Sequence, residues 1–396
     1  MYKLKDEFNL VQDWVYLDNA ASTPPMKCAI SASEKFLKTY GSVHRGTSFM
    51  SEVSTNMYED ARNSIQNIID PNNRGGVIFT SNSTDGLNKL SLMFDLENKK
   101  ILIPEHEHSS NLLPWQKCAQ YKNNIIILKN DPFVYSKINL EALECTIKKY
   151  RPFCLTFAIA TNVSGIAYTF KEMKDIYEIC NKYGVLVFHD ASQFVAHYKY
   201  SFDYADAVCF AGHKMYAPFG IGCLVLKKDL FGSDYNIITG GGNVENIEYS
   251  NISDSRYSKI LDIKPIYKKS FLQYETGTPN AIGAVALAAV FKRFAEIGFN
   301  EIEAHTKELC SYINKELLMY DSLGNTKQTP ILILKNTPKL AKELIKNKVA
   351  HRVGEFCVYS LFNALQLKPS IRLSAGATTE IEDLEKLKRI LSYANL

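Results

Sequence analysis

Short apolar runs alternate with amphipathic segments through the middle of the chain. Runs with the length and composition of buried strands span residues 77–80, 101–104, 125–128, 154–160, 185–189, 207–210 and 223–225. Between them, helical spacing appears near 84–95, 109–121, 139–149 and 171–183. Repeated strand–helix units of this kind predict an α/β fold, with a mainly parallel seven-stranded sheet covered by helices on both faces.

The flanking segments predict a second, smaller unit. Further helices are predicted near 26–40, 50–69, 279–297, 300–318, 338–347 and 380–394. From about residue 320, two or three strands accompany the last two helices, which is typical of a small α+β domain. The polar segment 233–270 is predicted to be an irregular lid or interface loop. We therefore expect a large domain over 16–295, and a small domain formed by an N-terminal arm, 1–15, and residues 296–396.

Composition and charge narrow the class of protein. The chain is 46% hydrophobic and 22% charged, as globular proteins are, and its net charge of +4 gives no reason to expect a nucleic acid partner. The nine cysteines are scattered without a C-x-x-C pair, which is typical of reduced thiols. Because no signal peptide or membrane-spanning run is apparent, we expect a cytoplasmic protein with no membrane partner.

A carboxylate and an amine follow two neighbouring apolar runs. Asp190 comes directly after the run 185–189, and Lys214 follows the run 207–210. Ligands bind at the carboxyl ends of strands in such sheets. Lys214 could hold pyridoxal 5'-phosphate (PLP) as a Schiff base while Asp190 keeps the pyridine nitrogen protonated. The alternative is that both are ordinary solvent-facing loop charges.

Two further loops follow strands. Hydroxylated residues at 80–86 could leave backbone N–H groups free for a phosphate, or could simply cap the next helix. The loop 105–111 carries two histidines beside a carboxylate, but no third metal ligand is near in sequence, so we expect no metal. His108 is better suited to stacking on a flat heterocycle or to moving a proton, although an exposed capping loop is the alternative.

The remaining candidates have plain structural alternatives. Asn162 ends a strand, where its amide could reach a cofactor ring or simply form a turn. Cys357 lies near Arg352, and neighbouring cations raise the thiolate fraction that a nucleophile needs. Arg372 lies in a strand pattern and could bind a carboxylate. The alternatives are that Cys357 is a buried structural cysteine and that Arg372 forms an ion pair at the surface.

Taken together, an ordered series of motifs resembles the class V aminotransferases of PLP fold type I. The series comprises YLDNAAST at 16–23, VHRG at 43–46, EHSSNLLPW at 107–115, NVSG at 162–165, DASQ at 190–193, GHKMY at 212–216 and ETGTPN at 275–280. The chain is most similar to the SufS-type cysteine desulfurases and selenocysteine lyases, nearly from end to end. The chain differs from the residues usual in this family at Ala211, Ala217 and Phe219 and around 240–244. These differences leave the expectation of PLP intact and weaken the assignment of a substrate.

The resemblance implies a role for each matching residue. Lys214 would bind PLP covalently and move protons, Asp190 would pair with the pyridine nitrogen, and His108 would stack on the ring. Other expected cofactor contacts are Gln193 and Asn162 near the ring, Ser83, Thr84 and His213 at the phosphate, and Thr278 at the phosphate of the neighbouring subunit. That last contact implies a homodimer with a shared active site. Arg372, Arg352 and Asn19 would bind the substrate, and Cys357 would take the sulfur.

The implied activity is that of a cysteine desulfurase. L-cysteine would give L-alanine and a persulfide on Cys357, which would pass its sulfur to an acceptor protein. The alternative is another class V enzyme, such as a C–S lyase, an epimerase or an aminotransferase of a biosynthetic pathway, in which Cys357 is not catalytic. A silent sulfur-transfer scaffold is disfavoured by the intact Lys214 and Asp190. The acceptor, the pathway and any activator protein stay open.

Overall fold

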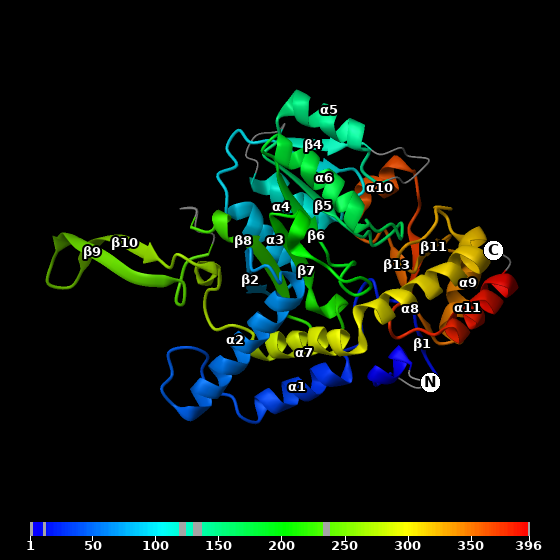
Figure 1. Cartoon of the computed structure of the whole chain (residues 1–396), viewed down its shortest axis with the longest axis horizontal. Coiled ribbons are helices and arrows are strands. Elements are labelled where there is room, and N and C mark those ends of the chain that lie inside the picture. Colours follow the sequence, from blue (N-terminus) through cyan, green and yellow to red (C-terminus); the bar gives the residue numbers. More distant parts are fainter. Residues whose placement is uncertain (1–2, 11–12, 119–123, 130–136, 233–237, 395–396) are drawn as a thin grey trace.

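The computed structural model describes residues 3–10, 13–118, 124–129, 137–232 and 238–394, with only the backbone of residue 118 included. Its core is a seven-stranded sheet in the order β2-β8-β7-β6-β5-β3-β4 (Figure 1). The strands are β2 (Gly75–Thr80), β3 (Ile101–Pro104), β4 (Ile125–Leu128), β5 (Cys154–Ala158), β6 (Leu186–Asp190), β7 (Ala207–Ala211) and β8 (Gly222–Lys227). The predicted α/β class with a mainly parallel seven-stranded sheet is confirmed.

One strand runs against the rest. β8 pairs antiparallel with both β7 and β2, whereas β3 to β7 pair with one another in parallel. The connection between β7 and β8 is the short segment 212–221, and a parallel crossover needs a dozen or more residues. The chain therefore reverses direction there, and that turn carries Lys214.

Alternate strand residues point to opposite faces, and each face has its own helices. One core packs Phe79, Phe157 and Phe210 against α1 (Lys27–Leu37), α2 (Phe49–Ile69), α5 (Leu140–Tyr150), α6 (Phe170–Lys182) and α7 (Ala281–Ile297). The other core packs Ile78, Phe188 and Leu224 against α3 (Ser83–Leu92) and α4 (Ser109–Cys118). Because α3 and α4 begin directly after β2 and β3, their N-termini lie at the same sheet edge as Asp190.

The C-terminal part forms a smaller layer. Its sheet has the order β11-β14-β13, made of β11 (Ile331–Leu334), β13 (Arg352–Gly354) and β14 (Ser370–Ser374), all antiparallel. Its helices are α8 (Phe299–Tyr312), α9 (Pro338–Lys346), α10 (Tyr359–Ala364) and α11 (Ile381–Ala394). The N-terminal β1 (Val15–Tyr16) pairs in parallel with β12 (Val349–Ala350), so the start of the chain packs on this layer. The proposed domain limits, at residues 15 and 295, stay a prediction.

The predicted irregular loop at 233–270 is wrong for most of its length. Residues 244–267 form a long antiparallel ribbon, β9 (Val244–Asp254) and β10 (Lys259–Tyr267), which projects from the body of the molecule (Figure 1). Tyr249 pairs with Ile263, while Glu248 pairs with Lys264 on the opposite face. This alternation of apolar and charged residues is the strand signal that the polar composition concealed.

Within the described part of the chain, no helix is both long and apolar enough to cross a membrane.

Candidate active site

Asp190 and Lys214 meet at the edge of the sheet. Asp190 is the last residue of β6 and is 6% exposed, and its Oδ1 accepts a hydrogen bond from the N–H of Ser192 at 2.9 Å. Lys214 ends the short 3-10 helix η3 (Gly212–Lys214), directly after β7, the strand that pairs with β6. Burial lowers the pKa of Lys214, and the Asp190 carboxylate opposes this shift. The structure therefore brings together the two residues on which the predicted cofactor site depends.

His108 faces the same space as a neutral ring. It precedes α4, and its Nδ1 accepts a hydrogen bond from the N–H of Ser110 at 3.1 Å, which leaves the proton on Nε2. Burial, followed by the charge on Lys214, lowers the pKa of His108 to about 4, and Asp190 acts in the opposite sense. At neutral pH this is a flat, uncharged imidazole beside the lysine and the acid, as stacking on a heterocycle requires.

A buried glutamate fixes the loop before α4, a role that the sequence analysis did not assign to it. Glu107, 2% exposed, accepts hydrogen bonds from Asn111 Nδ2 and from the N–H of Ala158, both at 2.8 Å. Thr156 Oγ1 in turn donates to Asn111 Oδ1 at 2.6 Å. These bonds tie the loop to β5 and so orient His108. The position of Glu107 next to His108 in the sequence was the only signal that could have indicated this role.

The helix α3 begins where a phosphate site was predicted. Asn82 caps it, because its side chain accepts a hydrogen bond from the N–H of Asp85 at 2.9 Å. Ser83 is 7% exposed, and Thr84 Oγ1 lies 2.7 Å from Ser110 Oγ, two residues after His108. The amides of a first helical turn lack intrahelical partners and favour an anion. Capping and phosphate binding are thus compatible at this helix.

The segment that carries Lys214 is held by the loop 18–23. The backbone oxygen of His213 accepts hydrogen bonds from Thr23 N at 2.7 Å and Thr23 Oγ1 at 3.0 Å. Gln193 Nε2 donates to the backbone oxygen of Ala20 at 2.7 Å. Burial, followed by the charge of Lys214, lowers the pKa of His213 to about 4, so its ring is also neutral. Gln193 and the backbone of His213 are thus tied to the same loop, and the contacts of both residues to a cofactor stay a prediction.

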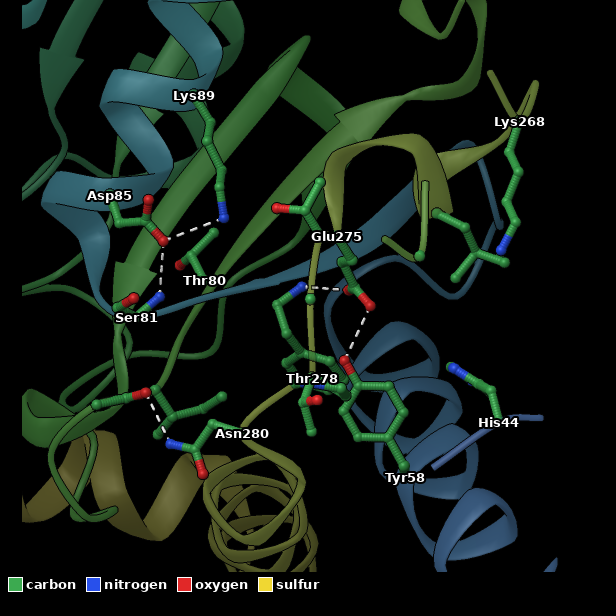
Figure 2. A pocket seen from close by; sticks show the side chains of 18 residues that line it. His44, Tyr58, Thr80, Ser81, Asp85, Lys89, Lys268, Glu275, Thr278 and Asn280 are labelled. Carbon is green, nitrogen blue, oxygen red and sulfur yellow. Dashed lines mark hydrogen bonds and ion pairs between the residues drawn. The ribbon is translucent and has the colours of Figure 1, made fainter. Parts of the chain in front are cut away.

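Thr278 lines a different cavity in the same chain. That cavity, of about 170 Å³, lies between the start of α3 and the segment 275–280 (Figure 2). Among the described residues that line it, Thr278 is the only predicted site residue; the rest include Ser81, Asp85, Lys89 and Asn280. Thr278 is exposed. Its expected role in the site of a neighbouring subunit stays a prediction.

Arg372 is a buried cation with a free donor. It is 2% exposed, its Nη1 donates to the backbone oxygen of Asn162 at 3.1 Å, and its Nη2 lies 3.6 Å from Asp18 Oδ1. Burial lowers the pKa of Arg372 to about 10, against the effect of Asp18. Its Nε is buried without a hydrogen-bond partner in the described part of the chain. An unsatisfied guanidinium N–H of this kind suits an incoming carboxylate.

Arg352 and Asn19, the other two residues predicted to bind the substrate, contact other residues of the same chain. Arg352 is half exposed, and its Nε lies 3.4 Å from Asp18 Oδ2, so Asp18 joins Arg352 to Arg372. Sequence reasoning missed Asp18 as this link. Asn19 donates to the backbone oxygen of Ser374 at 3.0 Å and accepts from Thr378 Oγ1 at 3.1 Å. Substrate contacts by Arg352 and Asn19 stay predictions.

Cys357 is exposed on a loop that is fixed from two sides. Its backbone oxygen accepts hydrogen bonds from Ser109 N at 2.8 Å and Ser109 Oγ at 2.9 Å. The oxygen of the preceding Phe356 accepts one from Asn162 Nδ2 at 2.9 Å. The charge of a Cys357 thiolate would raise the pKa of both Lys214 and Arg372, so the thiol lies within electrostatic reach of both. No cluster of metal-binding side chains occurs among the residues described.

The fold and this arrangement of lysine, acid and neutral imidazole define a PLP-dependent enzyme of fold type I. The chain belongs to the class V aminotransferase family, whose model matches residues 15–387. A probable cysteine desulfurase of Vibrio cholerae is 27% identical, covering 94% of this chain and 91% of that protein. A probable cysteine desulfurase of Streptomyces coelicolor is 32% identical over 77% of this chain and 71% of its own length.

Solved structures agree with the fold. The apo structure of a cysteine desulfurase from Thermococcus onnurineus has a TM-score of 0.83 at 24% identity, covering 98% of this chain and 96% of the other. The cysteine desulfurase CsdA from Escherichia coli has a TM-score of 0.82 at 21% identity, covering 100% of this chain and 98% of its own. At such identities the likeness shows the shared fold, so activity has to be argued from the site.

Proposed function

We propose that this enzyme is a cysteine desulfurase, which converts L-cysteine to L-alanine and leaves the sulfur as a persulfide on Cys357. The observation that carries the proposal is the position of Cys357, whose exposed thiol lies within electrostatic reach of both Lys214 and Arg372. A sulfur atom on a substrate held by these two residues would be accessible to that thiol. The relatives that are named cysteine desulfurases support the same activity.

The residues present fit PLP. Lys214 would carry its aldehyde carbon, Asp190 would face its pyridine nitrogen, and the neutral ring of His108 would lie against its face. Ser83, Thr84 and His213 would receive its phosphate at the first turn of α3. When bound, PLP supplies an electron sink for the bonds of the substrate's α-carbon.

Side chains of the enzyme would carry out the remaining steps. Because burial lowers the pKa of Lys214, its amine loses a proton more readily and can act as a base at the α-carbon of the substrate. Arg372 would bind the substrate carboxylate through the N–H that has no partner within the described chain. The Cys357 thiolate would attack the substrate sulfur; the new S–S bond forms, and the C–S bond breaks with its electron pair left on carbon. The β-carbon then gains a proton, balanced by the one that the Cys357 thiol released, and Lys214 returns its proton to the α-carbon to complete alanine.

A homodimer and a sulfur-acceptor protein are further parts of the proposal. Thr278 is exposed beside a cavity (Figure 2), and Lys214 of the same chain is not among the described residues that line it, which is consistent with a residue that serves a neighbouring subunit. Likewise, the exposure of Cys357 would let an acceptor thiol reach a persulfide there. Sedimentation of the PLP-loaded enzyme would test the first point.

The test of the activity is an assay with L-cysteine. Purified enzyme loaded with PLP should release equal amounts of alanine and, in the presence of dithiothreitol, sulfide. Cys357→Ala should lose both products and the persulfide, whereas Cys145→Ala, which removes another exposed thiol, should retain them. Lys214→Ala should lose turnover.

The contrary outcomes point elsewhere. Sulfide release that survives Cys357→Ala would indicate a C–S lyase in which PLP acts without the thiol. A wild-type enzyme that binds PLP yet yields neither product would indicate different class V chemistry, such as epimerisation or transamination.

A further inference from the structure

A second and larger cavity lies away from the proposed active site. Its volume is about 780 Å³, within the range that accommodates a small organic ligand. It lies between the start of α6, the segment 194–199 and the helix α8 with the turn that follows it. None of the predicted site residues is among the described residues that line it.

Aromatic side chains form much of its wall. Tyr198 is half-buried and Phe170 is exposed, so both rings are accessible to a ligand, whereas Tyr168 and Phe194 are each 2% exposed. The Phe194 ring packs against that of Tyr198, with centroids 5.1 Å apart. Tyr198 is fixed by a hydrogen bond to the backbone oxygen of Gln328. Rigid aromatic walls of this kind suit a flat apolar body, because they lose little conformational freedom when a ligand binds.

The polar lining is mainly cationic. Four lysines line the cavity, Lys199, Lys307, Lys315 and Lys327, against one carboxylate, which belongs to Glu303. Lys307 Nζ pairs with Glu303 at 2.6 Å, and the buried Lys327 pairs with Asp321 at 3.0 Å. The exposed Lys199 has no carboxylate within ion-pair distance in the described part of the chain, and Lys315 has only its neighbour Glu316, at 3.6 Å. The rim therefore carries positive charge that lining carboxylates do not neutralise.

We propose that this cavity is a regulatory binding site for a small organic anion, an aromatic carboxylate or sulfonate. Its flat body would lie against Tyr198 and Phe170, and its charge would face Lys199 and Lys315. The binding part of the proposal is independent of the desulfurase reaction.

The wall of the cavity is also the support of an active-site turn. Gln328 N and Thr329 N donate to the backbone oxygen of Gly165 at 2.7 and 2.9 Å, and Lys327 Nζ donates to that of Ser164 at 3.0 Å. Gly165 has a φ of +74°, and a Cβ there would lie 2.8 Å from Lys327 Cδ, so the contact is tight. A shift of this wall is therefore transmitted to the turn 162–165.

That turn reaches the proposed nucleophile. Its first residue, Asn162, donates to the oxygen of Phe356, next to Cys357, and accepts from Arg372. Occupation of the cavity would thus alter the position of the Cys357 loop without contact between the ligand and the active site.

Binding is tested with 8-anilinonaphthalene-1-sulfonate and PLP-loaded enzyme, so that the cofactor site is filled. We expect fluorescence that saturates at one probe per chain. The double variant Lys199→Glu/Lys315→Glu should weaken binding about tenfold, as the loss of two rim charges predicts. Ser311→Trp, which places an indole at an exposed lining position, should abolish it.

Two controls decide the result. Lys342→Glu reverses the charge of an exposed lysine on α9, outside the cavity, and should leave the affinity unchanged. N-phenyl-1-naphthylamine, which lacks the sulfonate, should bind more weakly than the anionic probe. Equal affinities for the two probes, or wild-type affinity in both cavity variants, would overturn the site.

Regulation has its own readout. Saturating probe should change the rate of alkylation of Cys357 by iodoacetamide at least twofold, while the rate at Cys145 stays constant. This measurement needs no turnover, so it stands even if the enzyme does not act on L-cysteine. An unchanged rate at Cys357 with the probe bound would overturn the regulatory role.

Discussion

At the residue scale, the reactive groups depend on neighbours that carry no chemistry themselves. Cys357 has a φ of +58° and Phe356 one of +54°, so two consecutive residues occupy the left-handed region, which costs free energy for residues with a Cβ. Ser109 and Asn162 offset this cost, because they donate three hydrogen bonds to the oxygens of these two residues. The loop is thereby held in one conformation, and Cys357 stays within electrostatic reach of Lys214.

We predict that Ser109→Ala slows persulfide formation on Cys357 about fivefold. The substitution removes the hydroxyl donor but keeps the backbone donor, and one neutral hydrogen bond contributes about 1 kcal/mol. Rapid-quench measurement of the persulfide tests this, with the absorption spectrum of bound PLP as a check that the cofactor is unaffected.

The matched control is Ser64→Ala, in which the lost hydroxyl donates to a backbone oxygen within α2. It should keep the wild-type rate. If Ser109→Ala also kept that rate, the hydroxyl of Ser109 would have no part in positioning the thiol.

At the element scale, one buried ion pair joins α2 to the segment that carries Thr278. Arg62 Nη1 and Nη2 donate to the two oxygens of Glu275 at 2.7 and 2.9 Å. Glu275 also accepts a hydrogen bond from Tyr58 Oη at 2.9 Å (Figure 2) and one from Phe79 N at 2.7 Å. The Glu275 carboxylate thus receives four hydrogen bonds from the helix α2 and the strand β2, both of which are distant from it in sequence. These bonds fix the position of the segment 275–280 and so that of Thr278.

We predict that Arg62→Ala lowers the free energy of unfolding by about 3–5 kcal/mol, because it leaves the Glu275 carboxylate buried without its cation. Urea unfolding followed by circular dichroism measures this. The double variant Arg62→Met/Glu275→Gln should recover much of the loss, since neither side chain then carries a charge.

A comparison with an exposed pair separates burial from charge. Lys38→Ala breaks the Glu34–Lys38 pair on the surface of α1 and should leave the unfolding midpoint unchanged. A double variant no more stable than Arg62→Ala would show that the loss arises from packing, and that the uncompensated charge contributes little.

At the scale of the whole molecule, the large core contains ionisable groups that must stay neutral. Burial lowers the pKa of His189 to about 3 and that of His197 to about 4, and these two side chains are 1% and 6% exposed. An unfolded histidine titrates near 6.5. Above that pH both states are neutral at these positions; below it the unfolded chain gains protons that the folded chain does not bind.

We therefore predict that stability falls as the pH drops from about 6.5 towards 4. For these two histidines the loss between pH 7.5 and 5.5 is about 3 kcal/mol in the free energy of unfolding. Urea midpoints at the two pH values measure it. Because His106, His108 and His213 have similarly lowered pKa values and the raised pKa of Glu107 acts in the opposite sense, a variant is needed to isolate this pair. His197→Gln should reduce the loss on acidification by about 1.4 kcal/mol relative to the wild type, and an unchanged dependence on pH in that variant would contradict a neutral His197.

The sequence alone determined most of the strands and helices and identified the candidate reactive groups. The apolar runs predicted the strands because a strand buried on both faces needs nearly continuous hydrophobic residues, as β5 and β7 show. The motifs placed Lys214, Asp190 and His108 at strand ends, and the structure brings them together. The ribbon β9–β10 was missed because its polar composition outweighed its alternation.

Only the tertiary structure decided how those groups are supported. Ser109 and Cys357 are 248 residues apart, and Arg62 and Glu275 are 213 apart, so no local pattern relates them. The reversed direction of β8 and the large cavity beneath the turn 162–165 likewise arise from packing between distant segments. Local propensity fixes which residues form a strand or helix, whereas contacts of this kind exist only once the chain has closed long loops.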